Sequence, residues 1–152
     1  MPPSPDKADD AYMLLALKAM AALPDTPLLL ANHPGRLATG FREYNKITPK
    51  QLRDWQDTAP EVVIGMSGAE GHQAAVFNRD GSLKPEGVRG EYPGYPTMGG
   101  YDQMTAKLGG VWDSLLSEGR RWWVTAVSDS HGHYTDGWAD FWPGEYAKTY
   151  VY

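Results

Sequence analysis

Cysteine is missing from this chain of 152 residues, and basic residues are outnumbered by acidic ones. Without thiols there is no disulfide and no thiolate metal site, so any metal must be held by histidine and carboxylate side chains. The 14 Lys and Arg residues against 19 Asp and Glu residues give a net charge of −5. This balance argues against sequence-independent nucleic-acid binding, which needs a basic surface. A small anionic substrate remains compatible, because a metal ion supplies positive charge locally.

The sequence also lacks a signal peptide and long apolar runs. Its first ten residues are rich in proline and aspartate, rather than basic and then apolar. No apolar stretch approaches the roughly 20 residues that a membrane-spanning helix needs. The sequence therefore predicts no contact with a membrane, and it does not indicate a compartment. Its length and a hydrophobic content of 41% suit one domain with a buried core.

Hydrophobic spacing predicts helices that alternate with short apolar strands. Three helices are expected, over about Asp10–Leu23, Pro49–Thr58 and Asp102–Glu118. Strands are expected at Leu28–Ala31, Val62–Met66 and Trp122–Val127, with a further one at Ala147–Val151. The alternation predicts an α/β fold in which parallel strands are joined by helical crossovers.

Two of the predicted helices carry specific local signals. Thr48 can cap the second helix, and Gln51 can complete a capping box with it. Gly109 and Gly110 lie inside the third predicted helix and indicate close packing against a neighbour. The apolar stripe of that helix is expected to be buried; it consists of Met104, Leu108, Val111, Trp112, Leu115 and Leu116.

All four histidines follow predicted strands. His33 follows the first strand, His72 the second, and His131 and His133 the third. Because the carboxyl ends of parallel strands meet at one end of a sheet, we expect these side chains to lie close together. Neutral imidazole and carboxylate oxygen are ligands that suit zinc, manganese or iron.

A carboxylate accompanies two of these histidines. Asp129 and His131 are two residues apart, so both side chains can face one ion if the segment is extended. The alternative is a turn in which Asp129 accepts a hydrogen bond from a nearby backbone N–H. Glu70 can be a ligand itself or can orient His72.

For four further candidate residues, two interpretations remain open. His33 can be a ligand or a buried histidine that donates to a backbone carbonyl, and His72 can be a ligand or an exposed loop residue. His133 can support a ligand or contact the substrate. Arg36 can bind a phosphate oxygen or can be an exposed surface charge.

Four segments together resemble the polymerase and histidinol phosphatase (PHP) family of metal-dependent phosphoesterases. They occur in family order, and the Asn-His-Pro segment at residues 32–34 and the Ser-Asp-Ser-His segment at residues 128–131 are the most specific. The four segments are Leu28–Pro34, Ile64–His72, Gly109–Arg121 and Val127–Gly132.

The resemblance implies a distorted α/β barrel of seven strands in which two or three divalent metal ions activate water for attack on a phosphate ester. It assigns His33, Glu70, His72, Asp129 and His131 as metal ligands, with Asp129 and His131 also catalytic. The substrate would be a small phosphorylated molecule. The residues assigned to its binding are Asn32, Arg36 and His133.

The chain departs from the family at its beginning. Members open with a His-x-His strand, and no such motif precedes His33. We therefore expect residues 1–152 to form a single domain that corresponds to the C-terminal portion of a PHP-like domain, without its first strands. Two interpretations stay open for this portion, an active phosphoesterase or a portion that is inactive by itself. The edges of such an open barrel would favour self-association.

Other hydrolase classes fit the motifs of this chain less well. Calcineurin-like phosphoesterases need Gly-His-x-His, whereas His131 and His133 follow Ser130. A serine or cysteine hydrolase is disfavoured because Gly-x-Ser-x-Gly and cysteine are both missing. The alternative from another class is a non-catalytic, aromatic-rich domain that binds a ligand or a partner through Trp138 or Trp142, with structural histidines.

Overall fold

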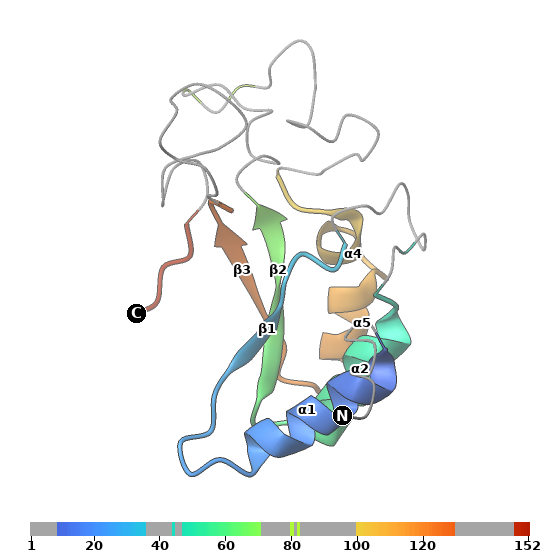
Figure 1. The fold of residues 1–152 in the computed structure, drawn as a ribbon. Coiled ribbons are helices and arrows are strands. Elements are labelled where there is room, and N and C mark those ends of the chain that lie inside the picture. The colour runs from blue at the N-terminus through green and yellow to red at the C-terminus, as the bar shows by residue number, and fades with distance from the viewer. Residues whose placement is uncertain are drawn as a thin grey trace.

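A parallel sheet of three strands forms the centre of the fold (Figure 1). The computed structural model describes residues 9–35, 44, 47–70, 80, 82, 100–129 and 148–152. The strands are β1 (Leu29–Ala31), β2 (Val63–Glu70) and β3 (Trp123–Val127), in the order β1-β2-β3. The predicted α/β fold with parallel strands is therefore confirmed, and β2 extends four residues beyond the predicted Met66.

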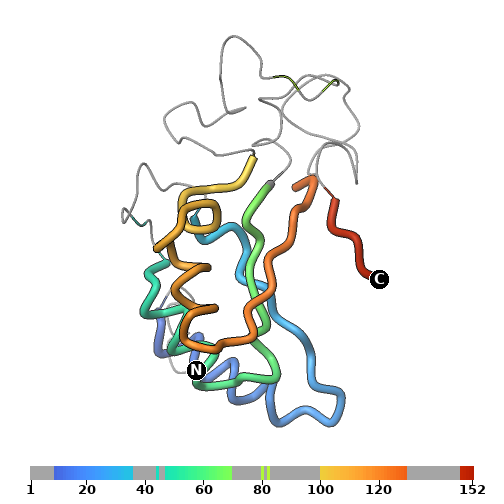
Figure 2. The backbone as a smooth tube through the Cα atoms, turned by 180° about the vertical axis from the view of Figure 1, so that it is seen from behind, coloured from blue at the N-terminus to red at the C-terminus, as the bar shows by residue number. Residues whose placement is uncertain are grey.

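The described helices lie along one side of this sheet, as the two opposite views show (Figures 1 and 2). They are α1 (Asp10–Ala21), α2 (Pro49–Thr58), α4 (Gln103–Ala106) and α5 (Val111–Ser117). Side chains from these helices and from the sheet meet in one apolar core. Its most deeply buried members are Leu17, Leu52, Val62, Val63, Met66 and Leu115.

The starts of α1 and α2 match the sequence predictions. The carboxylate of Asp9 accepts a hydrogen bond from the backbone N–H of Ala11 at 3.0 Å. Thr48 and Gln51 form the predicted capping box: the backbone N–H of each is hydrogen-bonded to the side chain of the other, at 2.9 and 3.3 Å. Each cap satisfies backbone donors that a helix start leaves without a partner.

The third predicted helix is wrong as a single element, because the chain breaks between α4 and α5. Gly109 has a φ of 73°, and the N–H of Gly110 donates to the carbonyl of Lys107 at 2.8 Å, which forms a turn. This turn changes the direction of the apolar stripe, so Leu108 is 89% exposed and Leu116 is 45% exposed. The glycine pair therefore indicates a break and not a packed helix interior.

The strand predicted at Ala147–Val151 is also wrong for its described part, since residues 148–152 have no strand structure. Thr149 instead binds the outer edge of β3 through its hydroxyl group. Its Oγ1 accepts from the N–H of Ala126 at 2.8 Å and donates to the carbonyl of Ala126 at 2.9 Å. One side chain thus satisfies two backbone groups that a neighbouring strand would pair.

Among the described helices, none combines the length and apolar character needed to cross a membrane.

Candidate metal centre

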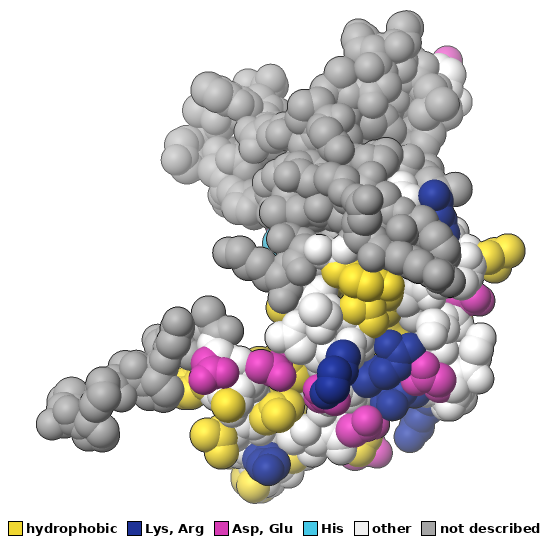
Figure 3. Space-filling model, turned by 90° about the vertical axis from the view of Figure 1, so that its right-hand side faces the viewer, with side chains coloured by type: hydrophobic (Ala, Val, Ile, Leu, Met, Phe, Trp, Pro, Cys, Tyr) yellow, Lys and Arg dark blue, Asp and Glu magenta, His cyan; other side chains and the backbone are white. Residues whose placement is uncertain are grey.

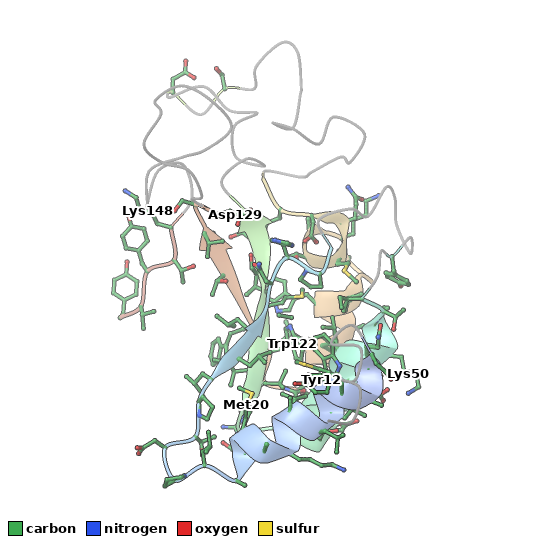
Figure 4. All side chains as sticks on the ribbon, viewed as in Figure 1. Tyr12, Met20, Lys50, Trp122, Asp129 and Lys148 are labelled. Atoms are coloured by element: carbon green, nitrogen blue, oxygen red, sulfur yellow. The ribbon has the colours of Figure 1, made fainter. Side chains whose placement is uncertain are left out.

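The carboxyl ends of the three strands point to the same end of the sheet. β1 leads into Asn32 and His33, β2 ends at Glu70, and β3 leads into Ser128 and Asp129. Figure 4 shows Asp129 just beyond the tip of β3. Ligand sites of parallel α/β folds lie at this end, because the loops that follow the strands meet there. The structure therefore places His33, Glu70 and Asp129 at the end where the sequence predicts a site.

The register sets His33 and Asp129 at different heights along the sheet. Ala31, the last residue of β1, pairs with Met66, whereas Val127, the last residue of β3, pairs with Glu70. β1 and β3 flank β2, so two strand spacings, or roughly 10 Å, separate them. His33 and Asp129 thus approach the same end of the sheet from its two edges.

The backbone is unusual at both of these residues. Among the described residues, His33 (φ 31°) and Asp129 (φ 53°) are the only non-glycine residues with positive φ. This region costs most L-residues roughly 1–2 kcal/mol, although Asp and His adopt it more often than other non-glycine residues do. His33 also precedes Pro34, and a residue before proline prefers an extended conformation with negative φ. Conformations of this kind cluster at functional sites, where the surrounding structure holds them in place. At Asp129 the positive φ also means that the backbone is not extended, so the predicted placement of Asp129 and His131 on one side of an extended segment is wrong at Asp129.

Asp102 supports the loop that carries His33, a role that the sequence did not reveal. A Cβ on Gly35 would lie 2.6 Å from the carboxyl atoms of Asp102, so the two residues are in close contact. Asp102 is 1% exposed, and its backbone N–H donates to the carbonyl of Gly68 in β2 at 3.0 Å. Its Oδ1 accepts from the N–H of Thr105 at 3.0 Å and so caps α4. Asp102 therefore connects the loop after β1, strand β2 and α4.

The signal for this residue in the sequence is an aspartate before a helix, which predicts a cap and nothing more. The closeness of Asp102 to Gly35 depends on tertiary packing, because the two residues are far apart in the chain.

Several predicted site residues lie outside the described residues, namely Arg36, His72, His131 and His133, together with Trp138 and Trp142 of the alternative function. Within the described part of the chain, no group of three or more His, Asp or Glu residues is placed to hold a metal ion. The structure thus places His33 and Asp129 at the predicted end of the sheet, and its described residues alone do not form a full ligand set.

The strongest charge cluster of the described residues lies elsewhere, on the helical side of the molecule (Figure 3). Arg53 of α2 donates from Nε to both carboxylate oxygens of Glu118 at 2.9 and 3.0 Å, and Arg120 donates to Glu118 at 2.8 Å and to Asp57 at 2.7 Å. The hydrogen bonds from Arg53 and then Arg120 lower the pKa of Glu118 to about 2. The hydrogen bond from Arg120 also lowers the pKa of Asp57. These ion pairs connect α2 to the segment between α5 and β3.

Comparison with known proteins gives no relative from which a function can be transferred. No protein-family model, no curated protein and no solved structure matches this chain. Its function is therefore argued from its residues and from the geometry at the carboxyl ends of the strands.

Proposed function

We propose that this chain carries part of a metal-dependent phosphoesterase site at the carboxyl ends of its parallel strands. The most direct support comes from the backbone conformation of two predicted metal ligands. The two described non-glycine residues with positive φ, His33 and Asp129, are also two of the residues predicted to bind metal. Strain of this kind persists where a particular side-chain direction is needed.

The predicted ligand set is suited to zinc, manganese or iron. His33, His72 and His131 supply imidazole nitrogen, and Glu70 and Asp129 supply carboxylate oxygen. The resemblance to the PHP family implies a cluster of two or three ions here rather than a single ion. Divalent ions held there would provide Lewis-acid activation of water and of a phosphate ester.

The remaining residues of the proposed site bind the substrate or hold a loop in place. Asn32, Arg36 and His133 bind the phosphorylated substrate, and Arg36 neutralises a phosphate oxygen. Asp102 holds the loop that carries His33 against β2 through its contact with Gly35 and its hydrogen bond to Gly68. In the finer architecture of this proposal, β1, β2 and β3 are neighbouring strands of a distorted seven-stranded barrel.

Hydrolysis of a chromogenic phosphate ester tests this proposal. The purified chain is incubated with bis(p-nitrophenyl) phosphate or p-nitrophenyl phosphate, with Mn²⁺ or Zn²⁺ in excess or with a chelator. We expect hydrolysis that depends on the metal. Asp129→Asn should lower kcat/KM by more than about 100-fold, since even residues that only orient metal ligands contribute roughly 10–100-fold.

The matched control is Asp25→Asn, which makes the same chemical change at an exposed position before β1, at the other end of the sheet. This variant should keep the wild-type rate. Hydrolysis that persists in the chelator, or that Asp129→Asn leaves unchanged, would count against the proposed site. No hydrolysis with either metal and either ester would reject the phosphoesterase function for this chain.

A further inference from the structure

The C-terminal segment, residues 148–152, lies against the outer edge of β3. Figures 1 and 2 show it running back beside this strand, in the direction opposite to that of β3. Of the five described residues in this segment, only Thr149 makes hydrogen bonds, and both of them go to the backbone of Ala126. The side chains that follow are open to solvent, since Tyr150 is 73% exposed and Val151 is 91% exposed. Thr149 is therefore the polar attachment of this segment to the sheet.

The two hydrogen bonds hold the backbone on both sides of Ala126. Oγ1 of Thr149 accepts from the N–H of Ala126 at 2.8 Å and donates to its carbonyl at 2.9 Å. A hydroxyl group can do both, because it is a donor and an acceptor at once. The N–H belongs to the peptide group before Ala126, and the carbonyl belongs to the peptide group after it. Holding both planar groups restricts the φ and ψ angles of Ala126, and with them the direction in which the chain leaves β3.

Ala126 lies close to a residue on which the proposed site depends. It is the last residue but one of β3, and Asp129 follows three residues later with a φ of 53°. On the inner edge, the pairing of β3 with β2 is irregular at this point, because the register shifts between Ser67 and Ala69, the partner of Ala126. An irregularity of this kind disrupts the ladder locally. Thr149 therefore adds a contact on the outer edge where the inner edge is least regular.

We propose that Thr149 is a positioning residue, through which the C-terminal segment sets the conformation of Ser128 and Asp129. The inference rests on the proposed function where it concerns metal binding, because Asp129 is one of the predicted ligands. Loss of the Thr149 hydroxyl group frees the outer edge of β3 and lets Asp129 leave its positive φ, which the surrounding structure must otherwise maintain. The proposed site is thus complete only while this segment is attached to β3.

Thr149→Val tests the inference, because valine has nearly the shape of threonine but lacks the hydroxyl group. Backbone amide exchange and chemical shifts of the full chain are followed by NMR. We expect the amide of Ala126 to exchange at least about fivefold faster, since it loses its acceptor. The Cα and Cβ shifts of Asp129 should change as its φ changes. The amide of Leu29 in β1, which donates to the carbonyl of Val62 at 2.7 Å, should keep its exchange rate.

Two further variants separate the hydroxyl group from other effects of the substitution. Thr149→Ser keeps both hydrogen bonds and should show the exchange and the shifts of the wild type. Thr58→Val makes the same chemical change in α2, where Oγ1 of Thr58 donates to the carbonyl of Asp54 at 2.7 Å. This matched control should leave Ala126 and Asp129 unaffected.

Calorimetric titration with Mn²⁺ tests the part that concerns metal binding. The Kd of Thr149→Val should be about five- to tenfold higher than that of the wild type, and those of Thr149→Ser and Thr58→Val should stay within about twofold of it. Wild-type protein that binds no Mn²⁺ would reject the proposed function. The exchange and shift measurements would still decide whether Thr149 positions Asp129.

Three results would overturn the inference. The first is an Ala126 amide that exchanges equally fast in the wild type and in Thr149→Val. The second is faster exchange at Ala126 with unchanged shifts at Asp129, since Thr149 would then be an edge contact without a positioning role. The third is a measurable wild-type Kd for Mn²⁺ that Thr149→Val leaves unchanged.

Discussion

At the scale of single residues, His33 and Asp129 combine a side chain predicted to bind metal with a backbone conformation that glycine would adopt more easily. The sequence allowed both residues to be placed at strand ends, because apolar runs before them predict the strands. Their φ angles could not be predicted, since the preference of His33 before Pro34 is for an extended backbone. Asp102 was missed as a site residue for a related reason. Its burial results from contacts with Gly35 and Gly68, which only the folded chain brings together.

The ion pairs of Glu118 lead to a prediction about pH at the same scale. The pKa of Glu118 is lowered from 4.5 to about 2 by Arg53 and Arg120. Its contribution to stability is thus complete above about pH 4.5 and is lost as the pH falls toward 2. Glu118→Gln should lower the free energy of unfolding at pH 7, by under about 1 kcal/mol because the pair is partly exposed to solvent.

Urea unfolding of both proteins at several pH values checks this prediction. The difference between wild type and Glu118→Gln should be constant from pH 7 to about 5 and should shrink below about pH 4.5. Lys50→Gln is the control, since the Lys50–Asp54 pair lies within α2 and does not connect two elements. A difference that grows as the pH falls would contradict the assigned role of Glu118.

At the scale of elements, the sequence predicted correctly a feature that depends on only a few consecutive residues. The capping box of Thr48 and Gln51 was predictable because all of its atoms belong to four consecutive residues. The break between α4 and α5 was not, although Gly109 and Gly110 marked the position. The stripe from Met104 through Leu115 has helical spacing, and the sequence alone does not show that Gly109 adopts a φ of 73°.

The cap of α2 gives a prediction at this scale. Thr48→Ala removes the acceptor for the backbone N–H of Gln51 and should lower the free energy of unfolding by about 1 kcal/mol. Thr48→Ser keeps the hydroxyl group and should stay within about 0.5 kcal/mol of wild type. Thermal unfolding followed by circular dichroism measures both variants. Equal losses in the two variants would show that packing of the Thr48 methyl group, and not the cap, stabilises the start of α2.

At the scale of the whole molecule, the order of the elements brings His33, Glu70 and Asp129 to one end of the sheet. The helix–strand alternation predicted parallel strands, and the parallel order β1-β2-β3 follows from it. The register did not follow from the sequence. β1 ends beside Met66, and β3 ends beside Glu70, so His33 and Asp129 approach from different heights and opposite edges. The proposed cluster of ions therefore rests on the family resemblance and not on this register.

Metal content is the most direct test of this account. The purified chain is equilibrated with excess Mn²⁺ or Zn²⁺ at neutral pH, free metal is removed, and bound metal is determined by mass spectrometry. The wild type and the Asp25→Ala control should retain about one ion or more per chain, and the Asp129→Ala/His131→Ala variant should lose it. Wild-type protein without metal, or equal metal content in all three proteins, would contradict the proposed metal centre.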